Sequence, residues 1–253
     1  MTTFRYSSPS SIIALTSLRQ ADWPEEGNFA LRQAKDKAGV VANRQRILGE
    51  FDLDLGQVVM PQQTHSAHCY QVGQEDLGRG ARSAETGIAD CDGLYTFDKG
   101  IIVGVLTADC VPVLFYEEGS GLVGAIHSGW RGTVQEISRK AFDQIKEAHP
   151  QVAIDQVQVH IGPALSQEKF EVQADAYQAF HALAYAEDSI TYRESSQRWH
   201  IDNQAVVAKQ CQLSGIPAAN IHIHHHCTYQ NPDSFSYREN GTPYRHGHLI
   251  VRV

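Results

Sequence analysis

The sequence has no hydrophobic run long enough to cross a membrane. A transmembrane helix needs about 20 consecutive apolar residues, whereas the apolar run nearest the N-terminus covers only Ile12–Leu15. That run is also too short for the apolar region of a secretory signal. We therefore expect a cytoplasmic protein without a membrane partner.

Cysteine is scarce and irregularly placed. The five cysteines, Cys69, Cys91, Cys110, Cys211 and Cys227, are odd in number and never stand in C-x-x-C spacing. This pattern argues against a disulfide framework and against a structural zinc finger. Free thiols in a reducing compartment are the better interpretation.

Positive charge is also in short supply. The formal net charge is -8, which argues against nucleic acid as a partner, because binding to phosphate backbones depends on Lys and Arg. The hydrophobic fraction of 42% and the charged fraction of 20% are typical of a globular protein. No repeat, low-complexity tract or linker divides the chain, so we expect a single domain over residues 1–253. The sequence leaves monomer and homodimer open.

The centre of the sequence contains the clearest strand pattern. Three apolar runs, Ile101–Leu106, Val111–Tyr116 and Leu122–Ile126, are of strand length and are bounded by Gly, Asp or Ser. Cys110 lies in the polar break before the second run, and His127 closes the third. A thiol and an imidazole at the ends of neighbouring strands can meet in one pocket. They are a candidate metal pair, or a nucleophile with its base.

Neither residue is decisive alone. A lone cysteine beside apolar runs is usually a small buried hydrophobic group, and a histidine at a strand end is usually only hydrogen-bonded. The surrounding residues favour function, because polar and amphipathic side chains gather where the strands stop, as they do at many binding sites. These neighbours are Asp109, Ser128, Trp130 and Arg131.

The remaining pattern predicts an α+β fold with mixed sheets, layered α/β/β/α. Regular β-α-β alternation is missing, which argues against a doubly wound fold. We expect helices at Phe29–Leu48, Thr133–Ala148, Val172–Ala186 and Asn203–Leu213. Further strands are expected at Ser11–Thr16, Gln57–Met60, Asp155–Ile161, Trp199–Ile201 and His248–Val253.

Two histidine groups raise the question of a metal site. His65 and His68 would share a face only in a helix, and the preceding strand and Pro61 favour an extended segment, so at most one should reach the pocket. In Asn220–Cys227, alternate histidines face the same way. Same-face residues on one strand are about 6.5–7 Å apart, too far to share one ion, so we predict no dedicated metal site there.

The segment TADCVPVL at 107–114, followed by AIHSGWRGT at 125–133, resembles the signature of the laccase-domain (YfiH-like) family. Its members were formerly described as multicopper polyphenol oxidases. They are now regarded as zinc-dependent purine nucleoside phosphorylases with adenosine deaminase activity. The resemblance runs from about Asn43 to the C-terminus.

The resemblance implies a metal centre. The family's Gln-x-His motif falls on Gln63-Thr64-His65 and selects His65 as a ligand beside Cys110 and His127. Zinc accepts such a mixture of nitrogen and sulfur ligands, and three protein ligands leave its fourth position open. Copper is a possible occupant. Cys110 and His127 would then be catalytic, with Asp109 or Asp92 as proton carrier.

The resemblance also implies the substrate contacts. Arginine suits phosphate, because its guanidinium offers a bidentate fork, and Trp130 or Tyr237 could stack on a base. The implied substrate-binding residues are Arg44, Gln63, Arg131, Ser236 and Arg238, and Arg245 is placed near the pocket. Where the family usually carries a cysteine after Gly162-Pro163, this chain has Ala164, so the metal site cannot depend on a thiol there.

The resemblance implies phosphorolysis of adenosine, inosine or guanosine with phosphate, giving the base and ribose 1-phosphate, together with deamination of adenosine. One alternative is a metal-free hydrolase with Cys110 as nucleophile and His127 as base. Another is a copper-dependent polyphenol oxidase, but that chemistry needs several histidine clusters, and the H-x-H pairs at 222–224 and 246–248 stand alone. A third is a zinc-binding protein without catalysis.

Overall fold

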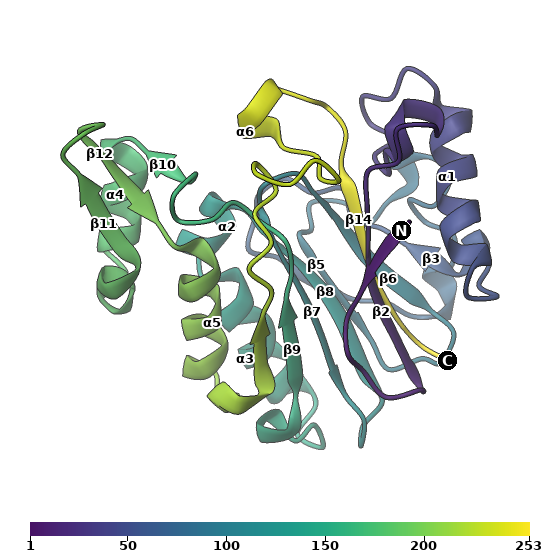
Figure 1. Cartoon of the computed structure of the whole chain (residues 1–253). Coiled ribbons are helices and arrows are strands. Elements are labelled where there is room, and N and C mark those ends of the chain that lie inside the picture. The colour runs from purple at the N-terminus through teal and green to yellow at the C-terminus, as the bar shows by residue number, and fades with distance from the viewer.

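Two mixed β-sheets pack face to face in the computed structural model, which describes residues 1–253 (Figure 1). The first sheet contains, in spatial order, β1 (Thr3–Arg5), β2 (Ile12–Ser17), β14 (His246–Arg252), β6 (Ile102–Thr107) and β3 (Val58–Val59). The second contains β13 (Ile221–Ile223), β9 (Gln158–Ile161), β7 (Val111–Glu117), β8 (Leu122–Ser128), β5 (Gly93–Thr96) and β4 (Cys69–Gln71). Each sheet has an antiparallel centre and at least one parallel pair at an edge.

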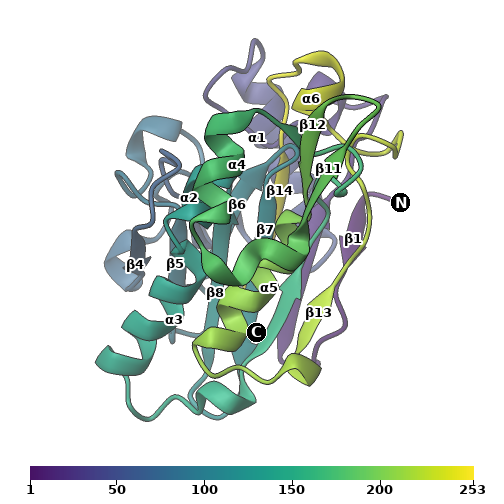
Figure 2. The same cartoon turned by 90° about the vertical axis from the view of Figure 1, so that its left-hand side faces the viewer.

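Helices cover the outer face of each sheet. Helix α1 (Lys37–Gly49) lies on the first sheet, and α3 (Ile137–Ala148) and α5 (Asn203–Leu213) lie on the second, preceded by the short α2 (Trp130–Val134) (Figures 1 and 2). The predicted α+β class, with an α/β/β/α order of layers in a single domain, is confirmed. None of the helices is both long and apolar enough to pass through a lipid bilayer.

A smaller unit stands at one side of the second sheet. It contains the antiparallel strands β10 (Glu171–Val172), β12 (Arg198–Ile201) and β11 (Ile190–Arg193), with α4 (Ala174–His181) packed on them around a separate apolar cluster. The short α6 (Tyr237–Asn240) lies between this unit and α1 in the view of Figure 1.

The central strands are buried on both faces because both faces are covered. In β7, Val113 and Phe115 pack toward the helices, whereas Leu114 and Tyr116 pack toward the first sheet. Val103 of β6 lies in the same intersheet cluster as Leu114. The strand predictions between residues 101 and 126 are therefore confirmed, and their continuous hydrophobicity follows from burial on two sides.

Helix boundaries differ from the predictions where local geometry intervenes. The helix expected from Phe29 begins only at Lys37, because the Asp36 side chain caps it by accepting a hydrogen bond from Gly39 N. The helix expected from Thr133 is divided, since Glu136 adopts a left-handed conformation (φ 61°) between α2 and α3.

Of the two later helices, one differs from the prediction and one has the predicted bounds. The helix expected over Val172–Ala186 is shorter, because α4 ends at His181 and a 3₁₀ segment follows it at Ala184–Ser189. The helix predicted at Asn203–Leu213 is confirmed with the same bounds, with Asp202 as its N-cap.

Candidate metal centre

The antiparallel pairing of β7 and β8 places Cys110, just before the start of β7, beside His127 near the end of β8. Val111 pairs with Ser128, and Pro112 pairs with His127. The residue before Val111 therefore lies beside the end of β8. This meeting of thiol and imidazole follows from strand register alone.

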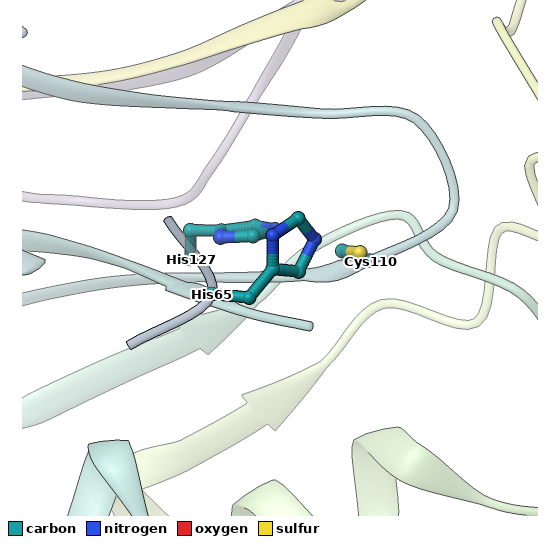
Figure 3. A group of neighbouring side chains, drawn as sticks. All are labelled: His65, Cys110 and His127. Carbon is teal, nitrogen blue, oxygen red and sulfur yellow. The ribbon is translucent and has the colours of Figure 1, made fainter. Parts of the chain in front are cut away.

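His65 reaches the same place from a loop after β3. Its backbone is left-handed (φ 62°), and the backbone N–H groups of Thr64, His65 and Ser66 all donate to the carboxylate of Asp92, at 3.0, 3.1 and 2.7 Å. These bonds turn the loop so that the imidazole of His65 points at the other two side chains (Figure 3).

Together, His65, Cys110 and His127 can hold a metal ion. One ligand atom from each lies within 4.8 Å of the others, and the two imidazole rings meet edge to face with centroids 4.9 Å apart. Two nitrogen donors and one thiolate suit tetrahedral zinc, and three protein ligands leave a fourth position for water or substrate. No other group of three or more potential ligands in the molecule is as close.

Asp92 fixes the orientation of His127. It is completely buried immediately before β5, and its Oδ1 accepts a 2.7 Å hydrogen bond from Nδ1 of His127. The backbone N–H of His127 also donates to the carbonyl of Asp92 at 2.7 Å. With Nδ1 occupied, Nε2 is the nitrogen left for a metal, an arrangement found at many histidine–metal sites.

The electrostatics of the centre favour a thiolate. Burial alone would raise the pKa of the Cys110 thiol, but the charge of His127 and hydrogen bonds from both imidazoles lower it to about 6. For His127, burial lowers the pKa, whereas the Cys110 charge and the bond to Asp92 outweigh it and raise the pKa to about 9. A cysteine must be deprotonated and a histidine neutral to bind a metal, so metal binding would keep the thiolate and displace the proton from His127.

The centre opens into a cavity of about 710 Å³. Cavities of this volume are typical of sites for small organic ligands. Aromatic side chains in its wall are Trp130, Phe170 and Tyr237, and cationic ones are Arg32, Arg44, Arg238 and Arg245.

Two predicted substrate-binding residues line this cavity with their polar atoms already engaged. Arg44 is 2% exposed, and its guanidinium donates to the carbonyls of Phe29, Gly80 and Ala81. Gln63 donates to the carbonyl of Leu106 and accepts from its N–H, which ties the His65 loop to β6.

The other three predicted contacts differ in position. Arg238 lines the cavity and donates Nη1 to two backbone carbonyls. Arg131 is exposed and outside the cavity, and its guanidinium lies over the ring of Trp130. Ser236 is fully buried outside the cavity and caps α6 by accepting from the Glu239 N–H.

Asp109, the other predicted proton carrier, lines the cavity beside Cys110. Its backbone is left-handed (φ 87°), and its carboxylate accepts from the hydroxyl of Thr228 at 2.7 Å and from the N–H of Arg238 at 2.6 Å. Asp109 thus attaches the C-terminal segment to the loop that carries the thiol.

Some cavity residues have no sequence signal. Asn203, at the first turn of α5, lines the cavity, and its Oδ1 has no hydrogen-bond partner although it is buried. Arg32, from a turn, and Glu85, from the 3₁₀ segment Ala84–Thr86, also line the cavity, and both are exposed. Asn203, Arg32 and Glu85 are far apart in the sequence, and only the tertiary fold brings them to one cavity.

The remaining histidines behave as their strand geometry requires. His68 is exposed and pairs with Asp90 rather than joining the centre. His222 and His224 lie near His160 of the neighbouring strand, with His160 Nδ1 3.3 Å from His224 Nε2, but no group of three ligands forms there. Ala164 does not line the main cavity, and the three grouped ligands include no residue near that position.

Most of the chain matches one family model. Residues 18–252 match the model described as "multi-copper polyphenol oxidoreductase laccase". The chain belongs to this family. The predicted laccase-domain resemblance is therefore confirmed.

Relatives in the laccase family carry names from nucleoside metabolism. The chain is 32% identical over 211 residues to purine nucleoside phosphorylase YlmD of Bacillus subtilis, covering 83% of this chain and 76% of that protein. It is 31% identical over 201 residues to adenosine deaminase RL5 of an unknown prokaryotic organism, covering 79% and 76%. This laccase-domain chain is thus similar to enzymes that process nucleosides.

Solved structures show the same fold. YlmD from Geobacillus stearothermophilus superposes with a TM-score of 0.91 at 27% identity, covering 100% of this chain and 96% of that one. The Bacillus licheniformis protein YfiH superposes with a TM-score of 0.93 at 23% identity, covering 100% and 97%.

Proposed function

We propose that this protein is a zinc-dependent purine nucleoside phosphorylase that also deaminates adenosine. The observation that carries the proposal is the convergence of His65, Cys110 and His127 at the wall of a cavity of nucleoside size. Relatives named purine nucleoside phosphorylase and adenosine deaminase support the substrate class. The five free cysteines support a reducing compartment, and we place the protein in the cytoplasm.

The metal is proposed from its donor set. Two imidazoles and a thiolate suit zinc, although Cu(II) can bind the same ligands. When bound, zinc supplies a Lewis acid that lowers the pKa of water to about 7. His65, Cys110 and His127 would hold it, and Asp92 keeps the His127 ring in the orientation that presents Nε2.

Two reactions would share this cavity. In phosphorolysis, a phosphate oxygen forms a bond to C1′ of the ribose while the C1′–N9 bond breaks, and the base leaves with the electron pair and takes up a proton. In deamination, water adds at C6 of adenine and ammonia leaves, giving inosine. Both need a proton carrier, and Asp109 is better placed than the enclosed Asp92 because it lines the cavity.

The cavity wall supplies the remaining needs of these reactions. Trp130, Phe170 and Tyr237 offer faces on which a purine can stack, and the arginines of the wall offer donors to phosphate. We propose a nucleoside and inorganic phosphate as the ligands.

A metal-free hydrolase is the second candidate. It is favoured by the low pKa of Cys110 beside His127 and by the bond from His127 to Asp92, which together resemble a nucleophile, a base and an orienting group. This reading leaves His65 without a role. A copper-dependent polyphenol oxidase is less well supported, since one three-ligand group cannot supply several clusters.

Purified protein tests the proposal directly. Its metal content is measured by mass spectrometry, and adenosine or inosine is incubated with and without phosphate. We expect bound zinc, ribose 1-phosphate only when phosphate is present, and inosine from adenosine in either case. Failure to convert any purine nucleoside in a zinc-loaded preparation would contradict the proposal.

A further inference from the structure

We propose that Arg245 forms the subsite for inorganic phosphate beside the metal centre. This inference rests on the proposed phosphorylase function, because phosphorolysis requires phosphate to be held next to the nucleoside. Arg245 lines the same cavity as Cys110 and His127.

The backbone of Arg245 is fixed immediately before β14. Its N–H donates to the side-chain oxygen of Asn28 at 2.9 Å, and its carbonyl accepts from the N–H of Phe29 at 3.0 Å. The Cα and Cβ atoms of Arg245 therefore cannot move without disturbing the segment at residues 28–29. A fixed backbone favours a preorganised binding group.

The guanidinium of Arg245 is hydrogen-bonded through Nη1, whereas its Nε and Nη2 are free. Nη1 donates to the carbonyls of Thr242 and Tyr244 at 2.8 and 2.7 Å, and the group lies 5.8 Å from the ring centroid of Tyr237. Neither Nε nor Nη2 donates to any group of the protein, and no carboxylate lies within ion-pair distance of this half-buried cation. The Nε–Nη2 edge is a fork that fits two oxygens of a phosphate.

The other arginines are less suitable. The guanidinium of Arg44 already donates to backbone carbonyls, and Arg131 lies outside the cavity. Arg32 and Arg238 line the cavity but are exposed, so solvent screens their charge more strongly. Arg245 is therefore the half-buried cation of the cavity wall whose Nε and Nη2 have no partner in the protein.

The neighbouring carboxylate does not occupy this fork. Both oxygens of Asp109 already accept hydrogen bonds, one from Thr228 and one from the N–H of Arg238. Asp109 contributes to the charge balance of the cavity without pairing with Arg245. The Nε–Nη2 edge of the guanidinium is therefore open to an anionic ligand such as phosphate.

The experiment compares the zinc-loaded wild type with R245M and R245K. Losing a bidentate charged contact should raise the KM for phosphate in phosphorolysis of inosine about ten- to a hundredfold in R245M. R245K keeps the charge but not the fork, and should lie between R245M and the wild type. The zinc content and the far-UV circular dichroism of both variants should match those of the wild type, which shows that they are folded.

R82M is the matched control, because Arg82 is exposed, lies outside the cavity and makes no side-chain hydrogen bond. Its KM for phosphate should equal that of the wild type. A direct binding measurement accompanies the kinetics: phosphate should raise the Tm of the wild type and of R82M but not that of R245M. AMP is compared with adenosine in deamination, to distinguish free phosphate from the phosphate of a nucleotide.

The results separate the two proposals. Three results would overturn the subsite. The KM for phosphate could stay unchanged in R245M, or it could rise about ten- to a hundredfold in R32M and not in R245M. Phosphate could also still raise the Tm of R245M. A loss in R245M confined to AMP would also overturn it, because the ligand would then be a nucleotide. A wild type that binds phosphate through Arg245 but converts no nucleoside would refute the proposed function and leave the subsite standing.

Discussion

The carboxylate of Asp92 lies 2.7 Å from Nδ1 of His127, and it also accepts the backbone N–H groups of the loop that carries His65. One buried side chain therefore orients two of the three residues of the candidate metal centre. This connects the sheet, through β5 and β8, to a loop that has no regular structure of its own.

Replacing Asp92 by asparagine should weaken metal binding about 10–100-fold, the usual effect of losing a group that orients a ligand. The amide would keep one acceptor but present N–H donors to the N–H groups of Thr64 or Ser66. Affinity is measured by competition with a chromophoric chelator. D22N is the control, since Asp22 is exposed and lies outside the cavity, and an equal loss in both variants would refute this role for Asp92.

Adding a methyl group at Gly129 should disturb the centre sterically. A Cβ there would meet the His65 ring at 2.8 Å and the Cys110 sulfur at 3.2 Å, while the backbone (φ -67°) accepts alanine without strain. We expect G129A to weaken metal binding about tenfold, because such sites tolerate displacements of only about 0.5 Å. G49A is the control, since a Cβ at Gly49 meets nothing within 4 Å. Unchanged affinity in G129A would show that the three side chains do not converge.

Stability should fall in mild acid because of buried neutral histidines. Burial lowers the pKa of His246 to about 4, and its ring bonds the carbonyl of Ser17 and the N–H of Phe235. Between pH 6.5 and 4 the unfolded chain binds a proton that the folded chain does not, so the free energy of unfolding decreases as the pH falls. From pH 7 to pH 5, His246 alone should account for roughly 2 kcal/mol. His160, whose pKa burial also lowers to about 4, acts in the same direction.

Urea unfolding between pH 5 and pH 7 measures this effect. H246Q should show a smaller loss of stability over that range than the wild type, even if it is less stable at pH 7. H68Q, which replaces an exposed histidine, should retain the slope of the wild type. Equal slopes in H246Q and the wild type would contradict the assignment.

The sequence predicts the local parts of this fold well. The three central strands and α5 are identified because apolar periodicity and an Asp N-cap are local signals. The register that unites Cys110 and His127 follows from two neighbouring strands. The start of α1 is missed because it depends on where Asp36 caps the chain.

The direction of an arginine side chain is not a local property. Arg44 and Arg131 have the motif positions of substrate contacts, yet one donates to carbonyls far along the chain and the other lies on Trp130 outside the cavity. Arg245 lines the cavity because Asn28, more than 200 residues earlier, anchors its backbone. His65 is similar, since only the distant carboxylate of Asp92 turns its loop inward.

The most direct measurement of the central claim follows metal content and turnover in the same preparations of wild type and C110A. We predict that the wild type retains zinc, loses both activities on chelation and regains them when zinc is restored. C110A should lose metal retention and both activities, while its thermal unfolding stays close to that of the zinc-free wild type, since bound zinc stabilises only the protein that retains it. Full activity in a preparation free of transition metal, abolished by alkylation of Cys110, would contradict the metal centre and favour the hydrolase.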